Sequence, residues 1–164
     1  MKLLFIFLAA LLAVSRCPAQ AQPAWSEAEK QIFTQLNQAR LENNLPALEW
    51  NDQAAKAARL HTQALLENGK LSHQFPAEPS VPERIGVTGV RFTFSAENVA
   101  RTEYLEDVHP ALMNSPGHRA NILNPKYNAV GIGVGGEGRQ NLRHTGFHLS
   151  HCYLLRRAIR PGLC

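Results

Sequence analysis

Hydrophobic residues recur every three or four positions near the start of the chain, a spacing that places them on one face of a helix. Ser26 precedes this run and Glu29 follows three residues later. This is the pattern of a capping box, in which each side chain accepts from a free backbone N–H of the first turn. A helix is therefore predicted over about residues 27–43, ending before Leu45 and Pro46.

A second segment with helical spacing begins at Asn51 or Asp52, either of which can cap a helix, and ends at Gly69. Alanine dominates its apolar face. Small side chains let another element approach closely, so this helix is expected near the centre of the domain. His61 lies on the same face. A buried, hydrogen-bonded histidine is the preferred interpretation, and a role in a cleft is the alternative.

Proline and glycine interrupt residues 71–98, which predicts a long loop with about one helical turn near residues 83–85. Loops of this length in compact domains are often functional. A third helix is predicted over residues 103–113, limited or kinked by Pro110. The turn after it leads His118 into another short ordered segment.

Two later segments have the patterns of strands. Residues 129–134 form an apolar run between glycine-rich turns, and residues 147–155 alternate apolar with polar side chains. Helices thus come first and strands later. This order predicts the α+β class, with helices packed on a small sheet.

The first residues have the composition of an export signal. Lys2 precedes an uncharged run over residues 3–14, which is too short to span a bilayer, and Ala19 and Ala21 are small side chains at the positions that a signal peptidase reads. Residues 1–21 are therefore predicted to be a signal peptide that is cleaved after Ala21. Residues 22–164 are predicted to form a single domain, secreted to the extracellular space or the periplasm.

The distribution of charge argues against some classes of binding partner, and the cysteine content allows one disulfide. The formal net charge of the chain is +4, and the basic residues are scattered except near the C-terminus. A role with nucleic acid or at a membrane surface would need a basic stripe, so neither is expected, and no membrane span is predicted after the leader. Cleavage would remove Cys17 and leave Cys152 and Cys164, which form a disulfide or stay as free thiols.

Five blocks of sequence, taken in order, resemble one protein family. They read LNQAR, LPALEWN, LSH, AENVA and NSPGHRANILNP, and the last leads into VGIG. Together they resemble the bacterial SCP-like domains of the CAP superfamily (cysteine-rich secretory, antigen 5, pathogenesis-related), most strongly over residues 32–134. The resemblance implies an α-β-α sandwich with helices packed around a small, mostly antiparallel sheet.

The C-terminal segment departs from the family. Residues 141–164 lack the aromatic strand pattern with which these domains usually end. Either divergence or a shifted reading frame near Gly138 would produce such a segment, so residues 139–164 are the least secure part of the assignment.

The resemblance also implies a site. Family members with the full site bring two histidines and two glutamates together in a central cleft, and His73, Glu97 and His118 match three of these positions. The position of the second glutamate holds Ser115, as is common in the bacterial branch. These four residues are the predicted binding cleft. His73 and His118 are its candidate ligands for zinc or another divalent cation, which is expected to bind weakly.

Two functions are compatible with such a cleft. The preferred one is a binding module of the extracellular space or envelope, with a lipid, a glycan or a peptide as ligand, because catalytic zinc ordinarily has three protein ligands and this sequence offers two. The alternative is a metal-assisted hydrolase with Glu97 as general base. A polar cluster that merely holds loops together is the non-functional interpretation.

Overall fold

The computed structural model describes residues 25–136 and 148–157. In it, the first two helices begin and end at the residues that local sequence signals predict. Helix α1 (Glu27–Glu42) has the predicted capping box, in which the Glu29 carboxylate accepts from the Ser26 N–H at 2.8 Å. Asn51 caps α2 (Asp52–Asn68) by accepting from the Ala54 N–H at 2.8 Å, and Gly69 ends the helix with a φ of 63°. Both predicted helices are confirmed.

Four strands form one sheet in the order β1-β3-β4-β2. Strand β1 pairs with β3 in parallel, whereas β4 pairs antiparallel with both β3 and β2. The sheet is therefore mostly antiparallel, as predicted. The remaining elements, in chain order, are β1 (Glu49–Trp50), α3 (Val81–Gly86), β2 (Phe92–Thr102), η1 (Leu105–Asp107), α4 (Val108–Asn114), α5 (Pro116–Ile122), β3 (Ala129–Gly136) and β4 (His148–Arg157).

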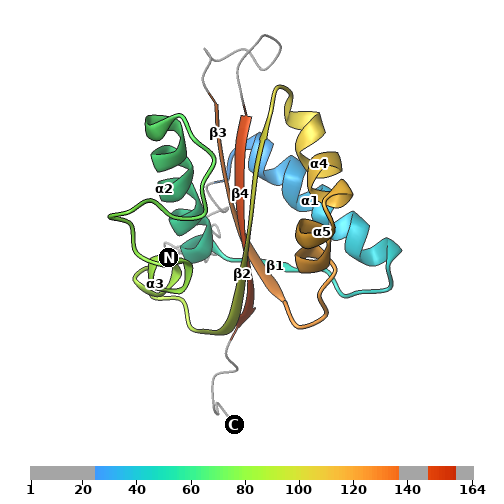
Figure 1. Ribbon diagram of the computed structural model, residues 1–164. Helices are drawn as coiled ribbons and strands as arrows, with labels where there is room; N and C mark the ends of the chain where they lie inside the picture. Colours follow the sequence, from blue (N-terminus) through green and yellow to red (C-terminus); the bar gives the residue numbers. More distant parts are fainter. Residues whose placement is uncertain (1–24, 137–147, 158–164) are drawn as a thin grey trace, which may run out of the picture.

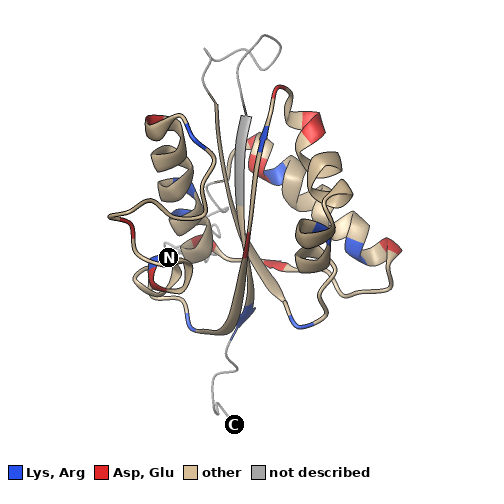
Figure 2. Cartoon of the chain, in the orientation of Figure 1, with Lys and Arg blue, Asp and Glu red and all other residues tan. Residues whose placement is uncertain are grey.

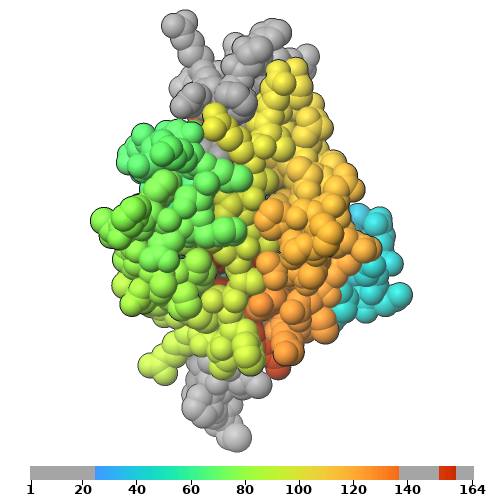
Figure 3. Space-filling model, in the orientation of Figure 1, coloured from blue at the N-terminus to red at the C-terminus, as the bar shows by residue number. Residues whose placement is uncertain are grey.

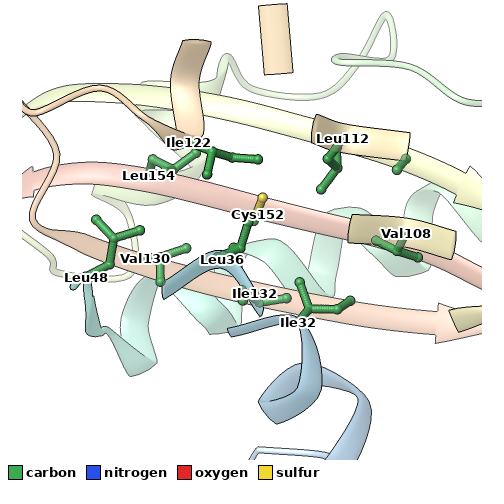
Figure 4. Packing of buried hydrophobic residues seen from close by; sticks show 11 residues of the cluster. Ile32, Leu36, Leu48, Val108, Leu112, Ile122, Val130, Ile132, Cys152 and Leu154 are labelled. Atoms are coloured by element: carbon green, nitrogen blue, oxygen red, sulfur yellow. The ribbon is translucent and has the colours of Figure 1, made fainter. Parts of the chain in front are cut away.

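Helices cover both faces of the sheet, which gives the predicted α-β-α sandwich and the α+β class (Figure 1). Helices α2 and α3 lie on one face, and α1, α4 and α5 lie on the other. Figure 4 shows the core under the second group, where Ile32 and Leu36 of α1 pack against Leu112, Ile122 and the sheet. Apolar burial on both faces is what holds the layers together.

Helix α2 lies close against β3. A Cβ atom at Gly133 would lie 2.5 Å from the backbone nitrogen of Arg59, and one at Gly131 would overlap the backbone of Ala54 and Ala55. The alanine face of α2 and the glycines of β3 thus allow a contact that larger side chains would prevent. The close approach predicted for this helix is confirmed, but α2 lies in an outer layer of the sandwich rather than at the centre of the domain, and Leu60 on its outer face is exposed.

The structure corrects two boundaries. Strand β2 occupies the end of the region predicted as a loop, because its pairing with β4 joins Glu97 to Tyr153, far away in sequence. The third helix begins at Val108 rather than at residue 103. This start leaves Pro110 in the first turn of α4, where its missing N–H removes no helical hydrogen bond. The short helices α3 and α5 match the predicted turn and short ordered segment.

The last strand differs from prediction in its burial. Cys152, Tyr153, Leu154 and Leu155 are all fully buried, because β4 has neighbours on both sides and helices on both faces. Among the residues that the structure describes, Cys152 has no disulfide partner, and burial raises the pKa of its thiol to about 12. The leader, Cys17 and Cys164 lie outside the described residues.

Within residues 25–136 and 148–157, no helix is both long and apolar enough to cross a membrane. Lys and Arg lie interspersed with Asp and Glu over the described elements (Figure 2).

Candidate functional site

Three elements carry the predicted site residues. His73 lies in the loop between α2 and α3, Glu97 lies on β2, and His118 lies in the first turns of α5. In the space-filling view, the green segments of α2 and the following loop and the orange segment of α5 approach each other across the yellow-green β2 (Figure 3).

His73 and Glu97 are in direct contact. The Nδ1 atom of His73 pairs with Oε2 of Glu97, whose side chain is 4% exposed, whereas that of His73 is 65% exposed. In a neutral ring, a carboxylate beside Nδ1 favours the tautomer that carries its proton there. That tautomer leaves the lone pair on Nε2, so the exposed ring presents an acceptor for a metal or for a ligand proton.

The second carboxylate oxygen of Glu97 is also engaged. Arg84 of α3 donates from Nη2 to Oε1 of Glu97 at 2.7 Å and to the main-chain oxygen of His73 at 2.8 Å. The side chains of Arg84 and Glu97 are buried, so this is a charge-assisted hydrogen bond shielded from water. Glu97 is therefore held between a cation and the imidazole that it orients.

His118 completes the group from the other helical layer. Asn98, next to Glu97 on β2, donates to the main-chain oxygen of His118 at 3.1 Å, and Asn121 donates to the Asn98 amide oxygen at 2.9 Å. Burial lowers the pKa of His118, and its electrostatic interaction with the nearby His73 ring lowers it further. The His118 ring is therefore favoured in its neutral form, which is the form that binds metals.

Ser115 lies in the turn between α4 and α5. It is half-buried, and its backbone accepts from the Arg119 N–H at 2.9 Å. Among these described residues, its hydroxyl has no hydrogen bond to His73, Glu97 or His118. The assignment of Ser115 to the cleft stays a prediction.

The predicted site offers few side chains that could bind a metal ion. In the part of the chain that the structure describes, no group of three or more His, Cys, Asp or Glu side chains could hold a metal ion. The two imidazoles of the predicted site stay candidate ligands, and a cation there would need further donors from solvent or a bound ligand. Glu97 suits such a site as the residue that orients His73, since Arg84 already occupies its other oxygen.

A polar cluster behind the cleft was not predicted as a unit. His61 of α2 is 1% exposed and hydrogen-bonded, as expected: Nε2 pairs with the Ser72 oxygen at 3.0 Å and Nδ1 with the Glu78 carboxylate, while the Arg84 guanidinium lies against the same edge of the ring. Burial opposes ionisation of Glu78, but hydrogen bonds from Arg84 and His61 lower its pKa. Glu78 and Arg84 lack a sequence signal because their partners lie on separate elements.

The segments that carry the predicted site residues also match a known protein family. The model of the family described as the cysteine-rich secretory protein family, CAP, matches residues 33–153. The uncharacterized protein YkwD of Bacillus subtilis (strain 168) is 32% identical over 106 residues, which cover 64% of this chain and 41% of YkwD. The chain thus spans less than half the length of that relative.

Solved structures of similar fold come from other bacteria. An extracellular protein containing an SCP domain from Bacillus anthracis superposes with a TM-score of 0.65 at 26% identity, covering 80% of this chain and 41% of that protein. An outer surface protein of Borrelia burgdorferi superposes with a TM-score of 0.68 at 22% identity, covering 81% of this chain and 95% of that protein. At that identity the second likeness concerns the fold.

Proposed function

The chain belongs to the cysteine-rich secretory protein (CAP) family, and from that premise we propose that it is a binding module of the extracellular space or the cell envelope. Two observations support the location. The sequence begins with the pattern of a signal peptide, and the similar Bacillus anthracis protein is described as extracellular. We expect its ligand to be a lipid, a glycan or a peptide. The predicted cleft of His73, Glu97, Ser115 and His118 would hold it.

The engagement of Glu97 is the observation that carries this proposal. One oxygen accepts from Arg84 and the other pairs with His73, so the carboxylate is committed to orienting an imidazole. A general base needs a lone pair directed at a reacting water. The arrangement therefore favours binding through the two histidines over proton transfer by Glu97.

A divalent cation such as zinc would be held by Nε2 of His73 and by the ring of His118. When bound, it would supply a positive centre that attracts an oxygen of the ligand. Glu97 would keep the His73 ring in its ligating tautomer. Because the protein supplies two ligands, the affinity should be weak. Because both imidazoles must be neutral to bind, the affinity should also depend on pH.

Calorimetric titration with zinc tests this site. We expect weak binding near neutral pH that fades as the pH falls through the imidazole range, as protons compete for His73 and His118. The lowered pKa of His118 means that this ligand stays available to lower pH than an ordinary histidine. A His73→Ala, His118→Ala double variant should lose the binding.

A matched control replaces a histidine outside the cleft. His109 of α4 is half-buried, and burial lowers its pKa in the same direction. His109→Ala should bind zinc as the wild type does. Unchanged zinc affinity in the double variant would exclude His73 and His118 as the metal ligands.

Glu97→Gln separates binding from the alternative, a metal-assisted hydrolase. The change keeps the shape of the side chain but removes its charge. It should lower stability by about 1–3 kcal/mol through the weakened bonds to Arg84 and His73, with thermal unfolding as the measurement. Glu83→Gln, at an exposed position of α3, is the control. We expect no turnover of peptide, ester or glycan substrates by the wild type.

Hydrolysis would show as a reproducible wild-type activity that disappears in a folded Glu97→Gln variant. Loss of a general base typically costs about 10²- to 10⁴-fold in rate. That result would replace the binding module with the hydrolase.

A further inference from the structure

Arg84 is a buried cation directly behind the cleft. It lies on the short helix α3, and its side chain is 7% exposed. A buried guanidinium is stable only when charged or polar partners satisfy its donors. The identity of those partners therefore indicates what this residue holds in place.

One end of the guanidinium bonds to His73 directly and to the carboxylate that contacts its ring. Its Nη2 atom donates to the main-chain oxygen of His73 at 2.8 Å and to Oε1 of Glu97 at 2.7 Å, while Oε2 of Glu97 pairs with the His73 ring. A single group thus fixes the backbone of His73 and the carboxylate that sets its tautomer. The planar fork of arginine suits this task, because a lysine ammonium is a point charge on a flexible stem.

The other end of the guanidinium is anchored away from the cleft. Its Nη1 atom donates to Oε1 of Glu78 at 2.6 Å and lies 2.5 Å from Nδ1 of His61, a residue of α2. The ring of Tyr153 on β4 lies under the guanidinium at 5.9 Å. Arg84 is therefore held from α2, the loop and the sheet at once, and its position does not depend on α3 alone.

The loop that carries His73 is held mainly by polar contacts. Residues 69–74 and 76–77 are exposed apart from Ser72, which is half-buried, and Phe75 is the partly buried apolar side chain that packs on a core cluster there. Polar contacts take the place of apolar packing over this stretch: Arg84 and His61 bond to the main chain of His73 and Ser72, the Glu78 carboxylate accepts from the Phe75 N–H at 3.1 Å, and Arg101 donates to the Gly69 oxygen at 3.3 Å. The direction of the His73 ring is thus decided by the cluster behind it.

We propose that Arg84 is a positioning residue of the cleft, which fixes the tautomer and the direction of His73 through Glu97 and through the His73 carbonyl. The inference rests on the proposed binding function, because the orientation of the His73 ring matters only if His73 binds a ligand or a metal. Arg84 need not touch the ligand, since its effect reaches the cleft through Glu97.

The test measures His73 in metal-free protein labelled with ¹⁵N, through the two-bond couplings of its ring nitrogens. Wild-type His73 should carry its proton mainly on Nδ1. In Arg84→Met, and to a lesser degree in Arg84→Lys, the ring should shift toward the Nε2–H tautomer that predominates for histidine in water. Arg84→Lys keeps the charge and decides the question if Arg84→Met does not fold.

Arg59→Met is the matched control, because Arg59 also forms a close ion pair with a buried carboxylate, Glu29, at 2.7 Å. It should leave the His73 tautomer unchanged even if it lowers the melting temperature. Zinc titration of the same variants should show about a 10-fold loss of affinity for Arg84→Lys and none for Arg59→Met.

An unchanged His73 tautomer in a folded Arg84→Lys or Arg84→Met variant would overturn the inference, and so would an equal shift in Arg59→Met. The tautomer measurement needs no ligand. A protein that binds no zinc but shows the shift would refute the metal site and keep the role of Arg84.

Discussion

Arg40 shows how one residue at the end of α1 fixes the segment that leads from α5 into β3. Its side chain is 1% exposed and donates to four main-chain oxygens: those of Pro46 at 2.9 Å, Ile122 at 2.7 Å, Asn124 at 3.1 Å and Tyr127 at 3.1 Å. Burial lowers its pKa. Because α5 also carries His118, Arg40 of α1 supports that residue from within the same helical layer.

Replacing Arg40 with lysine should therefore be costly. A lysine ammonium has no planar fork and cannot serve all four carbonyls, and hydrogen bonds to charged groups contribute about 1.5–3 kcal/mol each. We expect Arg40→Lys to lower the free energy of unfolding by about 3 kcal/mol in urea titrations. The control is Arg157→Lys, at an exposed ion pair with Glu49, where a change below about 1 kcal/mol is expected. Equal effects of the two changes would contradict this account of Arg40.

At the scale of elements, the contact between α2 and β3 depends on missing side chains. Gly131 faces the backbone of Ala54 and Ala55, so a methyl group there has no space unless the helix moves away from the sheet. Gly131→Ala should destabilise the protein by about 3 kcal/mol or more, measured as a fall in the midpoint of urea unfolding.

The matched control is Gly117→Ala in α5, where a Cβ atom would meet nothing within 4 Å. Alanine is also the better helix former, so this variant should be as stable as the wild type or slightly more stable. A Gly131→Ala protein of wild-type stability would mean that α2 can shift freely on the sheet.

The same scale explains which elements could be predicted. The ends of α1 and α2 follow from Ser26, Glu29, Asn51 and Gly69, whose interactions lie within one helical turn. Strand β2 forms its ladder with β4, which comes much later in the chain, and sequence patterns within a short window contain no sign of such a partner. The loop before it was predicted correctly as far as its prolines and glycines extend.

For the whole molecule, the predicted site residues lie where the two helical layers meet the edge of the sheet. Strand β2 is an edge strand and carries Glu97, the loop after α2 supplies His73 from one layer, and α5 supplies His118 from the other. A site built this way needs the entire sandwich. The chemistry of the three residues therefore cannot be separated from the fold.

Export is the prediction that belongs to this scale. The described fold begins at Trp25, so cleavage after Ala21 would leave every described element intact. N-terminal sequencing of protein recovered from the native host should therefore begin at Gln22. Finding Met1 at the start of most of the purified protein would contradict secretion through this leader.

The sequence by itself determined the α+β class and the ends of the first two helices, and its resemblance to CAP domains predicted His73, Glu97 and His118 as site residues. These depend on short-range capping, on periodicity and on blocks of residues that the family shares. The tertiary structure alone decided that Arg84 joins Glu97 to Glu78 and that the His73 ring turns its Nδ1 inward. Such contacts arise when separate elements pack together, because a buried charge must find its partner wherever the fold brings one within reach.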